Sequence, residues 1–213
     1  MRKPPKEPKI YHITHVDNLP AIIARGELLA DSEMVEQGGP AAPIGMRTLK
    51  DRRLSIECMN DLMVGACVPF YLCPRSVMLY VLHRGNHPDL SYTDGQGPIV
   101  HLEADLRKTV AWAESCARRW TLSTTNAASF YTDFRFTLQD LGDLCWSSIA
   151  ARDWRQTTVR EGKQAEFLVE TSFAWPLVER IGVHSQGTLE RATCALAKAA
   201  HRPVLEIRKE WYY

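Results

Sequence analysis

The sequence lacks the features that would place it in a membrane, outside the cell or around a metal ion. No apolar run approaches the roughly 18 residues that a membrane-spanning helix needs. The basic, proline-rich segment 1–9 is not followed by the apolar stretch of a secretory signal. The six cysteines include no Cys-x-x-Cys pair, so neither a disulfide framework nor a zinc site is expected. These absences predict a soluble, cytoplasmic protein that needs no metal and no membrane.

An excess of one charge is also lacking. The 26 Lys and Arg residues against 25 Asp and Glu leave a net charge of +1, so only local charge can attract a partner. The common catalytic motifs are absent as well: there is no Walker loop, Gly-x-Gly-x-x-Gly, His-Glu-x-x-His or Gly-x-Ser-x-Gly. The usual P-loop, Rossmann, zincin and α/β-hydrolase enzymes are therefore excluded.

What is present is the composition of a folded domain. The 213 residues are 45% apolar and 24% charged, and no repeat or low-complexity tract divides them. We predict one domain over residues 1–213, with 1–9 as an exposed basic arm. Strands are expected at 8–13, 28–30, 68–72, 99–102, 165–170, 180–184 and 204–207. Helices are expected from 19 to a stop at Gly26 and at 46–53, 76–83, 105–117, 136–151 and 187–200, with a loop at 31–45. Strands spread between short helices, without regular β-α-β alternation, favour an α+β fold.

Two of these helices carry more detailed expectations. Thr14 followed three residues later by Asp17 has the form of a capping box, so Thr14 is predicted to cap the first helix. The helix at 76–83 is predicted to bury Val77, Tyr80 and Val81.

Two polar segments near the N-terminal end could bind a ligand. His12 ends the first strand just before a helix N-terminus, where backbone N–H groups converge. It could equally be a half-buried strand histidine. The cluster of Arg47, Lys50, Arg52 and Arg53 could clamp phosphate, because guanidinium groups bind phosphate bidentately, or it could be a solvated helix face.

Further basic and aromatic residues suggest a nucleic-acid surface. Local positive charge recurs in the second half of the chain, and aromatic residues lie beside it that could stack on unpaired bases or belong to the core. The basic residues are Arg118, Arg119, Arg152 and Arg155, and the aromatic residues are Trp120, Tyr131 and Trp154.

Glu166 begins an otherwise apolar strand after a basic, glycine-containing loop. At a sheet edge and half desolvated, its carboxylate could stabilise a developing cation. An exposed edge-strand glutamate is the alternative.

Taken together, these segments resemble the DarT family of DNA ADP-ribosyltransferase toxins. The resemblance follows the family's order through Ile-Tyr-His-Ile-Thr-His-Val-Asp-Asn-Leu at 10–19, Asp-Arg-Arg at 51–53, Val-Pro-Phe-Tyr-Leu-Cys-Pro-Arg-Ser at 68–76 and Met-Leu-Tyr at 78–80. It continues with Gln-Ala-Glu-Phe-Leu-Val at 164–169 and Trp-Tyr-Tyr at 211–213. The resemblance implies an ADP-ribosyltransferase fold, in which a split, strongly bent β-core with peripheral helices holds NAD⁺ in its cleft.

The resemblance also implies roles for single residues. The family's His-x-Thr segment, which grips the nicotinamide end of NAD⁺, maps onto His12, Ile13 and Thr14, with further NAD⁺ contacts near Ala21 and Leu29. The catalytic arginine matches Arg53, with Arg52 as the close alternative, and the catalytic glutamate matches Glu166. An arginine stays protonated, so Arg53 is expected to act electrostatically on the diphosphate or the base rather than as a base itself. The basic and aromatic residues named above, together with Arg47, Lys50 and Arg52, are expected to bind the nucleic acid.

The family's reaction transfers ADP-ribose from NAD⁺ to a base in single-stranded DNA and releases nicotinamide, without a metal. By the same resemblance, the protein is a monomeric toxin whose partner is a DarG-like macrodomain antitoxin. One departure leaves the acceptor open: many relatives carry a Phe-Thr-Asp-x-His-like stretch where this chain has Trp-Thr-Leu-Ser-Thr-Thr-Asn-Ala at 120–127. Thymine is favoured and guanine is possible, and an RNA-modifying transferase or a degenerate nucleic-acid-binding module remains as an alternative.

Overall fold

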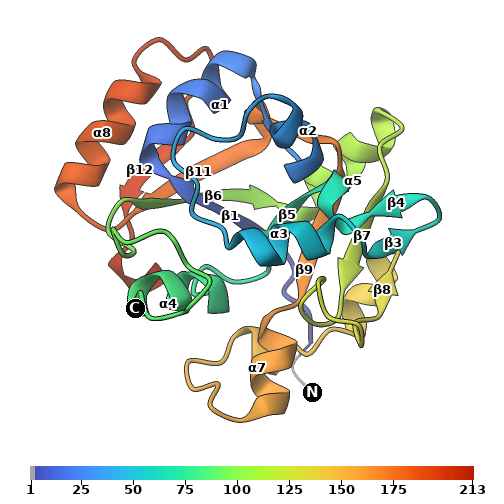
Figure 1. Ribbon diagram of the computed structural model, residues 1–213. Helices are drawn as coiled ribbons and strands as arrows, with labels where there is room; N and C mark the ends of the chain where they lie inside the picture. Colours follow the sequence, from blue (N-terminus) through green and yellow to red (C-terminus); the bar gives the residue numbers. More distant parts are fainter. Residues whose placement is uncertain (1–2) are drawn as a thin grey trace.

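A computed structural model describes residues 3–213 as a long mixed sheet surrounded by short helices (Figure 1). The helices are α1 (Leu19–Arg25), α2 (Asp31–Glu36), α3 (Arg47–Arg53), α4 (Val77–Arg84), α5 (Leu106–Ser115), α6 (Trp146–Ile149), α7 (Thr157–Lys163) and α8 (Gln186–Leu196). Short 3₁₀ turns are η1 (Val16–Asn18), η2 (Val64–Ala66), η3 (Leu138–Gly142), η4 (Trp175–Leu177) and η5 (Lys209–Trp211).

The central sheet has eight strands in the order β12-β11-β6-β1-β5-β9-β7-β8. These are β1 (Lys9–His15), β5 (Cys67–Tyr71), β6 (Ile99–Asp105), β7 (Trp120–Ser123), β8 (Phe134–Arg135), β9 (Glu166–Glu170), β11 (Val178–Val183) and β12 (Val204–Ile207). All neighbours pair antiparallel except β11 and β12. Two small sheets are formed by β2 (Glu27–Leu29) with β10 (Ser172–Ala174) and by β3 (Glu57–Met59) with β4 (Leu62–Met63).

The sheet is split between β1 and β5. β1 pairs with β6 along its whole length, whereas its register with β5 is confined to Tyr11 opposite Tyr71. Pro69 supplies a physical reason. The Pro69 carbonyl accepts a hydrogen bond from the His12 side chain on the β1 side. The nitrogen of the same residue faces that side too, and in proline it has no hydrogen to donate to a ladder. The central sheet is therefore open next to His12.

Of the three apolar clusters among residues 3–213, two pack around the pocket. One gathers residues from Ile10 to Ala199 and takes in α1, α5, α6 and α8. The other joins Ile13, Ile99 and α4 to Trp211 and Tyr212. Trp211 reaches the sheet because residue 182 is glycine: a Cβ there would lie 2.3 Å from the indole ring. The C-terminal aromatic residues thus close the second core.

The α+β prediction is correct, and each of the seven predicted strands is present in the expected region. Gly26 ends α1 with φ of 81°, as expected for a glycine stop. The structure adds strands and helices that the pattern did not indicate, including β7, β8 and α7. The segment 136–151 is two short elements, η3 and α6, rather than one helix.

Three local expectations are wrong. Thr14 lies inside β1, and His15 caps η1 instead, since its Nδ1 accepts from the backbone N–H of Asp17. The segment 31–45 is not entirely a loop, because it begins with α2. The helix α4 buries Leu79 and Leu82 rather than the face predicted from Val77, Tyr80 and Val81.

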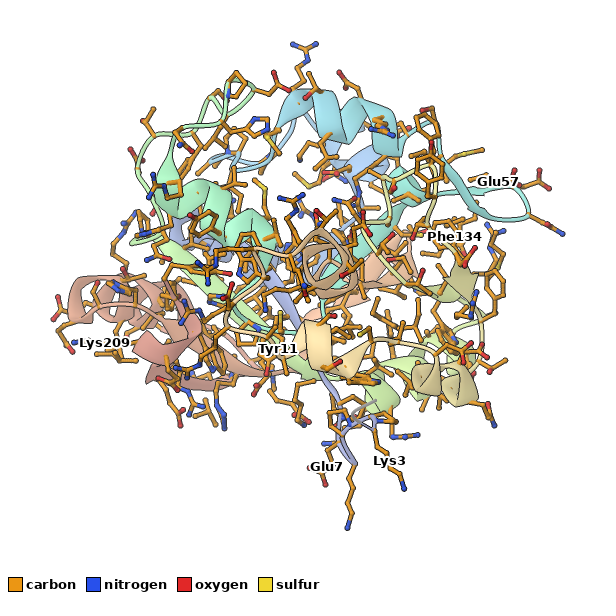
Figure 2. The ribbon with its side chains drawn as sticks, turned by 90° about the horizontal axis from the view of Figure 1, so that it is seen from below. Lys3, Glu7, Tyr11, Glu57, Phe134 and Lys209 are labelled. Carbon is orange, nitrogen blue, oxygen red and sulfur yellow. The ribbon has the colours of Figure 1, made fainter. Side chains whose placement is uncertain are left out.

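The N-terminal arm ends earlier than predicted. Lys3 and Glu7 project away from the body of the molecule in Figure 2. Pro8 is buried, and Lys9 begins β1 with ion pairs to Asp105 and Glu179 at 3.0 and 2.8 Å. Of residues 1–9, Met1 and Arg2 lie outside the described part of the chain. No helix within residues 3–213 has the length and apolar character to cross a bilayer.

Candidate active site

A pocket lies beside the split in the sheet, under the loop that joins α2 to α3. One wall is the end of β1, another is α1 with β2, and residues 39–46 form the cover. All six residues predicted to contact NAD⁺ line this one pocket, although they come from four separate elements. They are His12, Ile13, Thr14, Ala21, Leu29 and Arg53.

His12 is held in one orientation and one protonation state. Its Nδ1–H donates to the carbonyl of Pro69 at 2.9 Å, because a carbonyl can only accept. Burial lowers the pKa of His12, and the bond to Pro69 offsets this only in part. The neutral ring therefore keeps Nε2 as an acceptor at the open split.

Asn18 fastens the covering loop to the floor of the pocket. Its side-chain amide donates to the carbonyl of Ala42 at 2.9 Å and accepts from the Ala42 N–H at 2.9 Å. The same amide donates to Thr14 Oγ1 at 3.0 Å. Gly38 and Gly39, with φ of 84° and 85°, allow the chain to turn back after α2. One buried side chain thus joins β1 to the loop.

Cationic side chains lie along the pocket. Arg25 donates to Gln37 at 3.0 Å, and Lys50 is ion-paired with Asp31 at 2.7 Å. Lys50 was expected on the nucleic-acid surface, but it lines the pocket. The lining carries Arg25, Lys50 and Arg53 against Asp31, and this excess of positive charge suits a diphosphate.

At the inner end of the pocket, Arg53 and Glu166 form a buried ion pair. Arg53 Nη1 and Nη2 each lie 3.0 Å from Glu166 Oε2, and Nη1 also lies 3.3 Å from Oε1. The two residues are 7% and 3% exposed. Arg53 lines the pocket, whereas Glu166 lies behind it and is not part of the lining. The last residue of α3 is thereby attached to the first residue of β9.

The surroundings of this pair are also buried. Burial alone would lower the pKa of Arg53, but the carboxylate of Glu166 outweighs it and the pKa is raised. Burial and the same carboxylate raise the pKa of Tyr71, whose ring lines the pocket. Both groups therefore hold their protons at neutral pH, and neither is suited to act as a base.

The prediction that Glu166 stands at a sheet edge is wrong. β9 lies between β5 and β7, well inside the sheet, because β7 and β8 extend it beyond β9. Glu166 Oε1 accepts a further hydrogen bond from the backbone N–H of Ala127 at 3.0 Å. The carboxylate is therefore held between α3 and the chain that follows β7.

The residues predicted to bind nucleic acid divide into exposed and occupied groups. Arg52 is exposed and its guanidinium lies 4.3 Å from the ring centre of Phe130. The neighbouring Tyr131 is 94% exposed. Arg47 is exposed and only loosely paired with Asp51, at 3.9 Å.

Three other residues of that set are already engaged. Trp120 is buried and stacks on Phe167, so the expectation that its ring stacks on a base is wrong. Arg119 is ion-paired with Glu170, and Arg118 donates to the Glu170 carbonyl at 3.1 Å. Both arginines join β9 to the residues before β7.

The remaining basic residues of the predicted set lie before α7. Arg152 and Arg155 are exposed, and Arg155 is paired with Asp153 at 2.6 Å. Trp154 is half-buried, with its ring centre 5.0 Å from that of Tyr80 in α4. This patch is therefore accessible at the surface between α4 and α7.

Comparison with known proteins identifies the family. The family model described as "ssDNA thymidine ADP-ribosyltransferase, DarT" matches residues 11–213. The chain belongs to the DarT family. A DNA ADP-ribosyl transferase of Thermus sp. (strain 2.9) is 34% identical over 212 residues, covering 98% of each protein.

Solved structures agree with this membership. Thermus sp. 2.9 DarT in complex with ADP-ribosylated ssDNA matches with a TM-score of 0.89 and 34% identity, over 100% of this chain and 99% of that one. The NAD⁺ complex of the same protein gives 0.84 and 33%, over 99% and 100%. Thermosipho africanus DarTG in complex with ADP-ribose is alike in fold, with a TM-score of 0.75 and 17% identity over 97% of this chain and 51% of that one.

Membership of the DarT family confirms the predicted fold and reaction. The protein is an NAD⁺-dependent ADP-ribosyltransferase that acts on single-stranded DNA, and NAD⁺ is its substrate. Among residues 3–213, no group of three or more His, Cys, Asp and Glu side chains could hold a metal ion.

Several pocket residues were not predicted as site residues. Asn18, Tyr71 and Met78 lie within the segments that carry the DarT resemblance, but nothing in their spacing distinguished them from core positions. Loop 39–46 carried a signal in its glycines and prolines, which indicated a loop without indicating what it covers. These residues come together only in the folded chain, where they surround the split in the sheet.

Proposed function

We propose that Glu166 and Arg53 carry out the transfer of ADP-ribose and that the acceptor is a thymine base. The observation that supports this most is their buried ion pair at the inner end of the pocket. Departure of nicotinamide leaves a ribose with oxocarbenium character, and a carboxylate near its 2′-OH stabilises and orients that cation. Glu166 is the one carboxylate that Arg53 holds at this place.

Arg53 acts as a fixed positive charge in this proposal. It lies between the pocket and Glu166, so it can contact the diphosphate of NAD⁺ or polarise the acceptor base as its proton leaves. Its raised pKa supports an electrostatic role over proton abstraction. Arg52 is exposed and stacks on Phe130, whereas Arg53 is buried in the pocket wall, which favours Arg53 as the catalytic arginine.

The pocket supports a division of the NAD⁺ contacts. His12, Ile13 and Thr14 lie at the split and are proposed to grip the nicotinamide end. Ala21 and Leu29 are proposed to contact the remainder of NAD⁺ farther along the same pocket. Arg25 and Lys50 are placed to meet its phosphates.

The DNA strand is proposed to follow the exposed basic and aromatic residues around the inner end of the pocket. Trp120 leaves the set because it is buried, and Arg118 and Arg119 leave it because they are bound to Glu170 of β9. The residues that remain are Arg47, Arg52, Tyr131, Arg152, Trp154 and Arg155.

The decisive experiment compares two glutamates of the same strand. Glu166→Gln keeps the shape of the side chain but removes its charge, and we expect the transfer rate to fall by about 10² to 10³. Glu170→Gln is the matched control, since Glu170 also lies on β9 and is also paired with an arginine. It should keep the wild-type rate. A Glu166→Gln variant as active as wild type would remove Glu166 from the mechanism.

The same assay identifies the acceptor. The protein is incubated with NAD⁺ and short homopolymeric DNA and RNA strands, and modification is read as a mass shift. We expect the shift on oligothymidine. A shift on guanine-containing DNA instead would change the base, and a shift on RNA alone would contradict DNA as the substrate.

We further propose that the protein is the toxin of a toxin–antitoxin pair and acts in the cytoplasm as a monomer. The fold likeness to a DarTG protein supports a DarG-like macrodomain partner that removes the ADP-ribose. One apolar core spans residues from Ile10 to Ala199, which supports a single domain.

A further inference from the structure

We propose that Ser123 is a positioning residue for Glu166. Ser123 ends β7, and the β7–β9 register places it opposite Glu166, one step beyond the pair Leu122 and Phe167. At this step, the Ser123 hydroxyl accepts the backbone N–H of Glu166 at 3.0 Å. The side chain is fully buried. The backbone of the catalytic strand is thus fixed by a hydroxyl group at the residue that bears the carboxylate.

The same hydroxyl shapes the turn that reaches the carboxylate. Ser123 Oγ donates to the carbonyl of Thr125 at 2.7 Å, so the hydroxyl also binds the bend that follows β7. Four residues after Ser123, the N–H of Ala127 donates to Glu166 Oε1 at 3.0 Å. One serine therefore connects the main chain of Glu166 to the loop that holds its side chain.

Asn126 supports this loop from the other side. Its Oδ1 accepts from the Ala128 N–H at 2.8 Å, and its Nδ2 donates to Gln164 Oε1 at 3.2 Å. Three hydrogen bonds thereby join the segments 123–128 and 164–166. A carboxylate that must meet the ribose in one orientation gains from such support, because small displacements of a catalytic group are costly.

This inference rests on the proposed role of Glu166, and the test separates the two. Ser123→Ala removes both hydroxyl bonds and leaves Glu166 and Arg53 in place. We expect kcat at saturating NAD⁺ and DNA to fall about tenfold, while the Kd for NAD⁺ changes by less than about twofold. A general loss of structure would change both kcat and the Kd for NAD⁺.

Thr121→Val is the matched control. Thr121 lies two residues earlier on β7, on the same face, is also fully buried, and donates its hydroxyl to the Arg135 carbonyl at 2.9 Å. The hydrogen bonds of the Thr121 hydroxyl go to the carbonyls of Leu122 and Arg135, and not to Glu166. This variant should lose a comparable amount of thermal stability and keep the wild-type kcat.

The Ala127 amide gives a readout that is independent of activity. In ¹⁵N-labelled protein its proton resonance should be shifted downfield by the carboxylate, and Ser123→Ala should move it upfield, as should Glu166→Gln. Asn126→Ala should shift it in the same direction and serves if Ser123→Ala fails to fold. Unchanged kcat, or an unchanged Ala127 resonance in these variants, would overturn the proposal. An active Glu166→Gln would instead contradict the role of Glu166.

Discussion

At the scale of single residues, the site depends on two charges that water barely reaches. Arg53 and Glu166 compensate each other through three hydrogen bonds, and Ala127 adds a fourth to the carboxylate. Removing two charges from water costs several kcal/mol for each ion, and only close pairing offsets that cost. The pair is therefore a structural element as well as the proposed reaction centre.

Truncating either partner should destabilise the fold. Glu166→Ala leaves the Arg53 guanidinium buried without its counter-charge, and we expect the free energy of unfolding to fall by about 3–5 kcal/mol. Arg53→Ala should cost a similar amount. The double variant should cost clearly less than the sum, since it leaves no single charge unpaired. Urea denaturation of the four proteins measures this, and strict additivity would show that the two side chains do not stabilise each other.

At the scale of elements, the covering loop between α2 and α3 depends on Asn18. This side chain makes two hydrogen bonds to Ala42 and one to Thr14, and all three groups line the pocket. Ile44 of the loop also packs against the second core, and Gly38 and Gly39 begin the loop in the left-handed region. The Asn18 amide is therefore the polar link between the loop and β1.

Asn18→Ala should weaken NAD⁺ binding without changing the chemical step. Loss of the clamp allows the loop to leave its closed position, so we expect the KM for NAD⁺ to rise about tenfold and kcat to stay within about twofold of wild type. Asp17→Asn is the control, because Asp17 is the exposed neighbour that pairs with Arg191. An Asn18→Ala variant with a normal KM and a reduced kcat would place Asn18 in the reaction itself.

The sequence predicted individual strands better than it predicted which strands lie next to each other in the sheet. Apolar runs indicated the seven strands, and six of them have buried residues, whereas β12 at the sheet edge has none. The DarT resemblance selected six residues that share one pocket. The edge position of Glu166 was wrong because β7 and β8 are short and pair only across long stretches of chain. Trp120 was misjudged for the same reason, since its burial depends on Phe167 in β9. Pro69 was visible in the sequence, but its effect on the sheet required the position of β1.

At the scale of the whole molecule, a net charge of +1 gives little general attraction for DNA. Binding must depend on the exposed cations near the pocket, and the structure reduces their number. Arg53 is paired inside, and Arg118 and Arg119 are engaged with β9. The cations that remain lie on α3 and in the segment before α7.

This arrangement predicts a moderate salt dependence and a preference for unpaired bases. Each phosphate neutralised on a single strand adds about −0.7 to the slope of log affinity against log salt, so three contacts give a slope of about −2. Arg52→Gln should reduce the slope by about 0.7. Lys198→Gln should leave it unchanged, because Lys198 follows α8, on the far side of the molecule from β8 (Figure 1).

The base itself must reach Arg53 and Glu166, which lie too deep for a base that stays stacked in a duplex. Extruding a paired base costs a few kcal/mol, whereas an unpaired base can rest on an exposed aromatic ring such as that of Tyr131. We therefore expect full modification of a single-stranded oligonucleotide and at least tenfold less after its complement is annealed. Equal labelling of both forms, or a salt slope near zero, would contradict binding through these residues while leaving the NAD⁺ pocket unaffected.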